Sequence, residues 1–196
     1  MSMNTVPERL AALRAAMKAN GVDVYLIPVG DPHSSEYLPD HYTSLTYFSG
    51  FHGENSNFVV TMTESAVWAD GRYFVQAEKE IAGTEIQLMK MGEPGVPTVE
   101  EYCAKVVPEG GKLGLCGLTA SCALVNSVKK ALETKNAAIK TLFLEEEMAL
   151  QAGYLAIERE VMATTDAHGH CRYAPDAQVR RICRKMGMVF QHFNLF

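Results

Sequence analysis

Hydrophobic residues recur at helical spacing near the start of the chain. Leu10, Leu13 and Met17 fall on one side of a helix predicted over residues 6–20, and Gly21 is expected to end it. The next apolar run, residues 22–28, is short and ends in a proline, which is typical of a strand. The chain therefore begins with a helix that leads directly into a buried strand.

Beyond that strand, short apolar runs alternate with helical patterns. Residues 29–55 are polar, aromatic and rich in turn-forming residues, and we expect an irregular segment there. Further strands are predicted over 57–61, 66–69, 85–89, 112–116 and 138–144, and further helices over 73–81, 98–107 and 121–133. This alternation predicts an α/β fold, a mixed β-sheet flanked by helices, that occupies residues 1–145.

The pattern loosens after Leu144. A helix is predicted over 145–162, a short basic helix over 178–185 and an apolar strand over 187–191, followed by an apolar end. The formal charge changes from −8 over residues 1–165 to +3 over 166–196. We expect residues 146–196 to form a poorly packed tail rather than an independent domain, with a junction within 146–170.

Composition narrows the class of protein. The chain is 47% hydrophobic and carries a net charge of −5, so it can bury a core and is a poor partner for nucleic acid. Its five cysteines are odd in number and lack CxxC spacing, which argues against a disulfide framework or a structural zinc site. No apolar stretch reaches the length of a membrane span and no signal core opens the chain, so a cytoplasmic protein is expected.

Three polar-aromatic motifs carry the candidate chemistry. They read Asp31-Pro-His-Ser-Ser-Glu-Tyr, Tyr47-Phe-Ser-Gly-Phe-His-Gly and Trp68-Ala-Asp-Gly-Arg-Tyr. In the third motif Asp70 can cap the helix that follows, and the planar guanidinium of Arg72 suits a carboxylate. From the residues alone, Arg72 is either a ligand-binding group or half of a surface ion pair.

In this order the three motifs, together with Met89-Lys-Met-Gly, resemble the amino-terminal domain of the Xaa-Pro aminopeptidases (aminopeptidase P) in the creatinase/prolidase superfamily. The resemblance covers about residues 6–145. It implies a domain that packs against a catalytic "pita-bread" domain, makes dimer contacts and forms the rim of the substrate cleft. By resemblance, His33, Glu36, Tyr37 and Arg72 are the positions expected to face that cleft, in substrate orientation or assembly rather than in bond cleavage.

Enzymes of this family hydrolyse the bond before a penultimate proline with two divalent metals, usually manganese. Such a site needs converging carboxylates and a histidine, which the family places in the pita-bread domain, and nothing after residue 145 matches that domain. We therefore expect no catalytic residue, metal ligand or cofactor in this chain and no peptidase activity from it alone. Expected partners are a second copy or a family catalytic domain, and the alternative is an active Xaa-Pro aminopeptidase once such a domain complements it.

The tail has a resemblance of its own. Residues 172–196 are similar to the Q-loop region of the ATP-binding subunits of polar-amino-acid ABC transporters, with Gln191 at the position of the Q-loop glutamine. A phosphate-binding GxxxxGK[ST] loop is absent from the sequence, so no nucleotide site is predicted. The two resemblances favour a truncated or fused product, and a transporter-associated fragment is the alternative. His168, His170 and Cys171 lack a fourth ligand, and we expect a junction there rather than a metal site.

Overall fold

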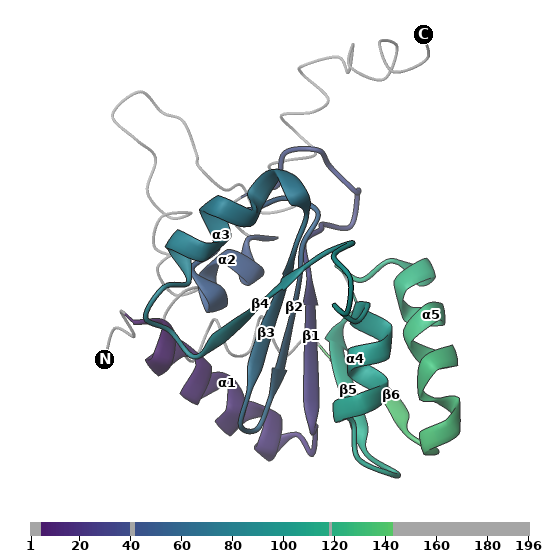
Figure 1. The fold of residues 1–196 in the computed structure, drawn as a ribbon. Coiled ribbons are helices and arrows are strands. Elements are labelled where there is room, and N and C mark those ends of the chain that lie inside the picture. Colours follow the sequence, from purple (N-terminus) through teal and green to yellow (C-terminus); the bar gives the residue numbers. More distant parts are fainter. Residues whose placement is uncertain (1–4, 40–41, 118, 143–196) are drawn as a thin grey trace, which may run out of the picture. The chain divides into compact units, whose positions relative to one another are not determined.

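A mixed sheet of six strands lies at the centre of the computed structural model (Figure 1). The structure describes residues 5–39, 42–117 and 119–142. All of these residues belong to one compact unit, Met1–Gly153. The strand order is β4-β3-β2-β1-β5-β6. Neighbours β1, β2 and β3 pair antiparallel, whereas β1 with β5, β5 with β6 and β3 with β4 pair parallel. The strands are β1 Val24–Pro28, β2 Asn57–Thr61, β3 Ser65–Ala69, β4 Ile86–Lys90, β5 Lys112–Cys116 and β6 Ala138–Leu142.

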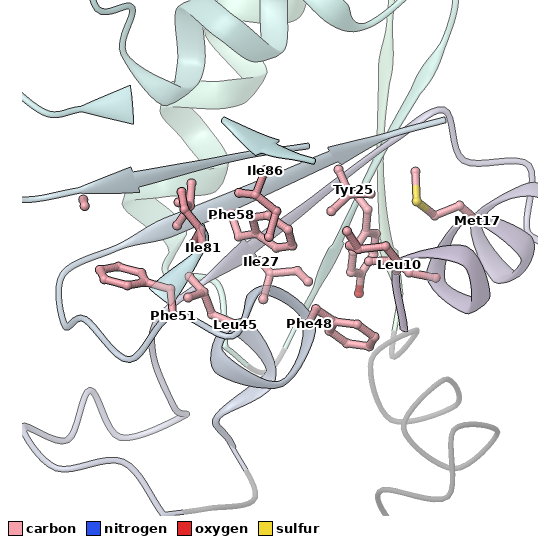
Figure 2. Packing of buried hydrophobic residues seen from close by; sticks show 14 of the residues in the cluster. Leu10, Met17, Tyr25, Ile27, Leu45, Phe48, Phe51, Phe58, Ile81 and Ile86 are labelled. Atoms are coloured by element: carbon pink, nitrogen blue, oxygen red, sulfur yellow. The ribbon is translucent and has the colours of Figure 1, made fainter. Parts of the chain in front are cut away.

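Helices cover both faces of the sheet, which confirms the predicted fold class (Figure 1). One face packs against α1 (Val6–Ala19), α2 (Ser44–Ser49) and α3 (Phe74–Glu80), and the other against α4 (Val99–Val106) and α5 (Cys122–Leu132). Within β1, Tyr25 and Ile27 enter the first cluster, shown in Figure 2, while Val24 and Leu26 enter the second. Because successive strand residues point to opposite faces, a strand covered on both sides must be apolar throughout.

The first helix begins where the sequence predicts it. Thr5 is its N-cap, and Glu8 reaches back to the Thr5 amide at 3.1 Å, which completes a capping box. At its other end Asn20 is the C-cap and Gly21 has φ +64°, a left-handed conformation that glycine adopts readily. The helix therefore ends at the glycine that was expected to stop it.

The segment 29–55 departs from the prediction because it contains α2. Leu45 and Phe48 lie three residues apart and are 2% and 1% exposed, so this short helix is stabilised by burial of one side. Gly50, with φ +76°, is its C-cap. Six residues give too short a pattern to stand out from the surrounding turns.

The remaining differences are small. The predicted helix over 73–81 starts with a turn of 3₁₀ helix, η2 (Gly71–Tyr73), before α3, and a similar turn, η3 (Glu133–Lys135), follows α5. Strand β3 includes Ser65, because this residue pairs with Val60 of β2 and Ile86 of β4, and its buried hydroxyl donates to Glu85 at 3.2 Å. The elements predicted over 145–162, 178–185 and 187–191 lie outside the described residues.

Candidate functional site

The strand directions bring the three motifs to one edge of the sheet. Segment 31–37 follows the carboxyl end of β1, and segment 70–73 follows the carboxyl end of β3. Since β2 runs antiparallel to both strands, residues 47–56, which precede it, reach the same edge. Strand β5 is parallel to β1, so residues 119–124 arrive there as well. Segments far apart in the chain thus meet at a single place.

A pocket of about 810 Å³ lies at this edge. Its described lining comes from segments 28–38, 42–46, 52–57 and 119–124. Glu36 and Tyr37 line it, and Tyr37 is 79% exposed, far more than is usual for a tyrosine side chain. An aromatic ring at the mouth of this pocket offers an apolar surface together with a hydroxyl group to a ligand.

The loop that carries Glu36 and Tyr37 is shaped by Asp31. This carboxylate is 6% exposed, and its Oδ1 accepts hydrogen bonds from the amides of His33 at 3.0 Å and Ser35 at 2.9 Å. Burial alone would raise the pKa of Asp31, but the hydrogen bonds from Ser35 and His33 outweigh it and leave the pKa below its ordinary value. An ionised Asp31 therefore fixes the turn at the start of the motif.

The segment 52–55 forms another wall of the pocket. The Phe51 ring before it is completely buried in the core (Figure 2), and Gly53 packs on that ring so closely that a Cβ would lie 2.1 Å from Phe51 Cζ. Asn55 adopts φ +49°, in the left-handed region where asparagine is tolerated. The absence of a side chain at Gly53 lets the wall pack on the aromatic ring, and the polar residues on either side of this glycine line the pocket.

The third motif supports this wall from outside the pocket. Asp70 caps η2 by accepting the Arg72 amide at 2.9 Å, and the Arg72 guanidinium holds the same carboxylate with Nη2 to Oδ2 at 2.9 Å. This pairing, through hydrogen bonds to both the side chain and the backbone of Arg72, lowers the pKa of Asp70 far below its ordinary value and raises that of Arg72. Of the two interpretations of Arg72, the structure contains the ion pair.

Of the four residues predicted to face a cleft, Glu36 and Tyr37 line the pocket. His33 lies in the same loop but is absent from the described lining, and Arg72 is adjacent to the wall through Asp70 and Asn55. Sequence reasoning left out Asp31, Glu54 and Asn55. Asp31 belongs to a recognised motif and makes local contacts with His33 and Ser35, whereas Glu54 and Asn55 follow the second motif and contact residues distant in sequence.

The described residues do not fit the pair of divalent ions that the family implies. Among residues 5–39, 42–117 and 119–142, no group of three or more His, Cys, Asp or Glu side chains is placed to hold a metal ion. Two carboxylates of the pocket already accept hydrogen bonds from protein donors, Asp31 from amides and Glu54 from the Tyr73 hydroxyl. We therefore assign no metal-dependent step to them.

The described cysteines are free thiols, with Cys103 and Cys116 buried and Cys122 exposed. Burial raises the pKa of Cys103 to about 12, so it remains protonated. In the part of the chain that the structure describes, none of the helices combines the length and apolar character needed to cross a bilayer. His168, His170, Cys171 and Gln191 lie outside the described residues.

The fold and the motif arrangement are those of the creatinase/prolidase amino-terminal domain. The model of that family, described as "Creatinase/Prolidase N-terminal domain", matches residues 9–146, and the chain belongs to this family. This confirms the resemblance that the three motifs indicated.

Relatives and solved structures agree with the assignment. The chain is 40% identical over 133 residues to "Aminopeptidase P2" of Arabidopsis thaliana, covering 67% of this chain and 19% of that protein. It is 42% identical over 115 residues to "Probable Xaa-Pro aminopeptidase P" of Sordaria macrospora, covering 59% of this chain and 18% of that one. The chain thus spans about a fifth of the length of these relatives.

Among solved structures, the chain is similar to the X-prolyl aminopeptidase of Caenorhabditis elegans, which is described as a cytosolic enzyme with a di-nuclear active site. The TM-score is 0.69 and the sequence identity is 25%. The match covers 94% of this chain and 32% of that one. The amino-terminal domain of the cytoplasmic peptidase PepQ from Mycobacterium tuberculosis matches with a TM-score of 0.53 and 26% identity over 71% of this chain and 97% of that one.

Proposed function

We propose that residues 1–145 act as the substrate-side module of an Xaa-Pro aminopeptidase, binding part of the peptide at the rim of the cleft while a separate domain cleaves it. The observation that carries the proposal is the convergence of the first two motifs on one pocket, with Glu36 and Tyr37 in its lining, while the third motif contacts the pocket wall from outside. The relatives named as aminopeptidases give the substrate class, a peptide with proline in its second position.

The chemistry of the pocket supports binding rather than bond cleavage. Its charged described groups include Glu36 and Glu54, which suit the ammonium group of a peptide, and the exposed Tyr37 ring suits an apolar side chain or the proline ring. The two-metal hydrolysis of the family belongs, in this proposal, to a catalytic domain supplied by the same polypeptide or by a partner. That partner is a family catalytic domain or a second copy of the chain, in the cytoplasm.

Peptide binding tests the proposal directly. We expect ¹⁵N-labelled 196-residue protein, titrated with Leu-Pro-Gly, to show chemical-shift changes at residues 35–37 and 52–55. Leu-Ala-Gly should bind more weakly, because it lacks the proline ring. Tyr37→Ala and Glu36→Gln should each weaken binding, whereas Glu133→Gln, remote from the pocket at the start of η3, should not. Equal binding of both peptides, or no shift at the pocket, would reject a proline-peptide rim.

A hydrolysis assay tests whether peptide binding and bond cleavage belong to separate domains. With manganese present, the chain alone should release no amino acid from Leu-Pro-Gly, whereas addition of the complementary region of the C. elegans enzyme should restore release. Proline-specific cleavage by the chain alone would show that the catalytic groups lie within it.

A further inference from the structure

The sequence contains a single Asn-Gly pair, Asn20-Gly21, in the turn that joins α1 to β1. Strand β1 runs from this turn toward the pocket, so the pair lies at the other edge of the sheet. Asn20 is half-buried and Gly21 is exposed, so water reaches the Gly21 amide. Glycine has no Cβ, and its nitrogen therefore approaches the side-chain amide of the preceding asparagine more easily than the nitrogen of any other residue would.

This pair of residues has the chemistry of deamidation. Hydroxide removes the proton from the Gly21 nitrogen, which attacks Cγ of Asn20 and closes a cyclic succinimide. The bond between Cγ and Nδ2 breaks, and the leaving nitrogen takes a proton from water and departs as ammonia. Water then opens the ring at one of its two carbonyls and leaves aspartate or isoaspartate at position 20. One water is consumed and one ammonia is released.

In the folded domain both reacting groups are held apart by hydrogen bonds of the helix end. Asn20 Nδ2 donates to the Ala16 carbonyl at 3.0 Å, and the Gly21 amide donates to the Lys18 carbonyl at 3.1 Å. The Asn20 ψ of 0° turns the Gly21 nitrogen toward the backbone nitrogen of Asn20, whereas ring closure needs it on the side of Cβ. Deamidation therefore requires the last turn of α1 to open.

Contacts on both sides of the pair oppose this opening. The Asn20 carbonyl accepts a hydrogen bond from Lys140 Nζ of β6 at 2.9 Å. The Val22 amide donates to the Met17 carbonyl at 2.9 Å, and the two side chains are 3% and 0% exposed in the first cluster, where Figure 2 shows Met17. The turn is thus tied to the core and to an outer strand.

We propose that Asn20 is a deamidation site, and that the last turn of α1 together with Lys140 keeps this site closed in the folded domain. The modification therefore records opening of this helix end, and the inference is independent of the proposed function. An aspartate at position 20 would place a carboxylate at the negative end of the helix dipole, against the Ala16 carbonyl. An isoaspartate would lengthen the backbone and draw the Gly21 amide away from Lys18. Either product should loosen the end of α1.

Mass spectrometry of the 196-residue chain tests the site. The protein is incubated at mildly alkaline pH, with and without urea sufficient to unfold it. In urea, Asn20 should deamidate faster than Asn136, which is exposed but is followed by alanine. In the folded protein the rate at Asn20 should fall by about tenfold or more, which corresponds to an opening free energy of at least about 1.4 kcal/mol.

Two results would overturn the proposal. Equal rates at Asn20 with and without urea would show that the helix end does not protect the pair. A rate at Asn20 in urea no higher than that at Asn136 would show that the pair is not a preferred site. Asn20→Gln serves as the chemical control, because its longer side chain does not form the succinimide, and it should abolish the mass change at this position.

Lys140→Met tests the contribution of the lysine. Loss of the hydrogen bond to the Asn20 carbonyl should raise the rate in the folded protein about two- to fivefold and leave the rate in urea unchanged. Lys129→Met, which removes an exposed lysine of α5 on the other face of the sheet, is the matched control and should change neither rate. Equal folded-state rates in the two variants would overturn the role assigned to Lys140.

Asn20→Asp reproduces one product and tests its consequence. Because the carboxylate faces the carbonyl end of α1, the melting temperature should fall by about 1–4 °C relative to the parent protein. Calorimetry of this variant beside Asn20→Gln, which keeps the amide donor, measures the difference. A melting temperature for Asn20→Asp equal to that of the parent would contradict the expected loosening of the helix end.

Discussion

Gly53 is the position at which one added methyl group should disturb the pocket most. A Cβ there would lie 2.1 Å and 2.6 Å from the Cζ and Cε1 atoms of Phe51, whose ring is fixed in the core. Because the buried Phe51 ring leaves no room for a side chain at this position, Gly53→Ala should lower the free energy of unfolding by about 1–3 kcal/mol. Urea denaturation monitored by circular dichroism measures this change.

Gly71→Ala is the control for this substitution. Its Cβ would meet only the Phe74 ring, at 4.0 Å, which is an ordinary contact. We expect a change within about 0.5 kcal/mol, as for other exposed sites. Equal destabilisation by the two substitutions would show that the packing of Gly53 on Phe51 is not the cause.

Asp31 should make the stability of the domain depend on pH. Although burial opposes it, hydrogen bonding to Ser35 and His33 holds the pKa of Asp31 in the folded protein below the ordinary value of 3.8. A carboxylate with a lowered pKa stabilises the fold above pH 3.8, and this contribution is lost as the pH falls through the folded-state pKa. Unfolding free energies of Asp31→Asn, measured from pH 7 to 3, should therefore decline less steeply than those of the parent protein.

Other carboxylates account for the slope that remains in this variant. The pKa of Glu85 is lowered by its hydrogen bonds with Arg14, and that of Asp70 by Arg72. Identical pH profiles for the parent protein and Asp31→Asn would mean that the turn at 31–35 does not depend on the charged form of Asp31.

At the level of residues, the sequence predicts best those contacts that have a local cause. The capping role of Asp70 follows from its place between a strand and a helix, and the Asp70 carboxylate does accept the Arg72 amide. The pairings of Glu54 with Tyr73 and of Asn55 with Asp70 join residues 19 and 15 positions apart. No local pattern specifies such pairs, since they depend on how the strands are arranged.

A capping box formed by Thr98 and Glu101 fixes the start of helix α4. The Glu101 amide donates to Thr98 Oγ1 at 3.2 Å, and Glu101 Oε2 accepts the Thr98 amide at 2.8 Å. Thr98→Ala removes the hydroxyl acceptor and should lower the free energy of unfolding by about 1 kcal/mol. Thr98→Ser, which keeps the hydroxyl, should be close to neutral in the same chemical denaturation. A neutral Thr98→Ala would mean that packing of α4 alone sets its start.

The same helix shows why most elements were predictable. A capping residue and an apolar side that meets the sheet both predict α4. The structure begins the helix at Val99, after the cap, and buries Tyr102 and Cys103. Helix α2 was not predicted, because it has no side-chain cap hydrogen bond and is held by the burial of Leu45 and Phe48 and by the Arg9 side chain, which donates to the Tyr47 carbonyl. Its stability comes from tertiary contacts, which a local pattern does not contain.

At the scale of the whole molecule, the chain pattern predicts a mixed sheet but not its strand order. Strand β1 lies between β2 and β5, so Leu26 pairs with Val59 on one side and with Leu115 on the other. This strand order brings the three motifs to the edge of the sheet at which the pocket lies. From the sequence, only the family resemblance indicated that the motifs act together. Strand directions are set by the whole set of crossovers, whereas hydrophobic patterns report each strand separately.

We expect the family domain to carry its own stability, because two hydrophobic clusters lie within it. The first joins α1, α2 and α3 to the sheet and the second joins α4 and α5, and among the described residues the buried members of both lie between Leu10 and Leu132. A protein comprising residues 1–146 should therefore unfold cooperatively, with a melting temperature within about 2 °C of that of the 196-residue chain, since a difference near 1 kcal/mol shifts a domain of this size by about 2–4 °C. Differential scanning calorimetry and near-ultraviolet circular dichroism check both statements.

A shorter protein, residues 1–136, makes this experiment decisive. It removes β6, which pairs with β5 in parallel register, and with it Ile139, which packs against the second cluster. The loss should expose β5 as an edge and uncover part of that cluster, so the melting temperature should fall by clearly more than about 4 °C. If residues 1–146 melted as poorly as residues 1–136, the stabilising contacts would have to come from beyond residue 146. The predicted boundary at residue 145 would then be wrong.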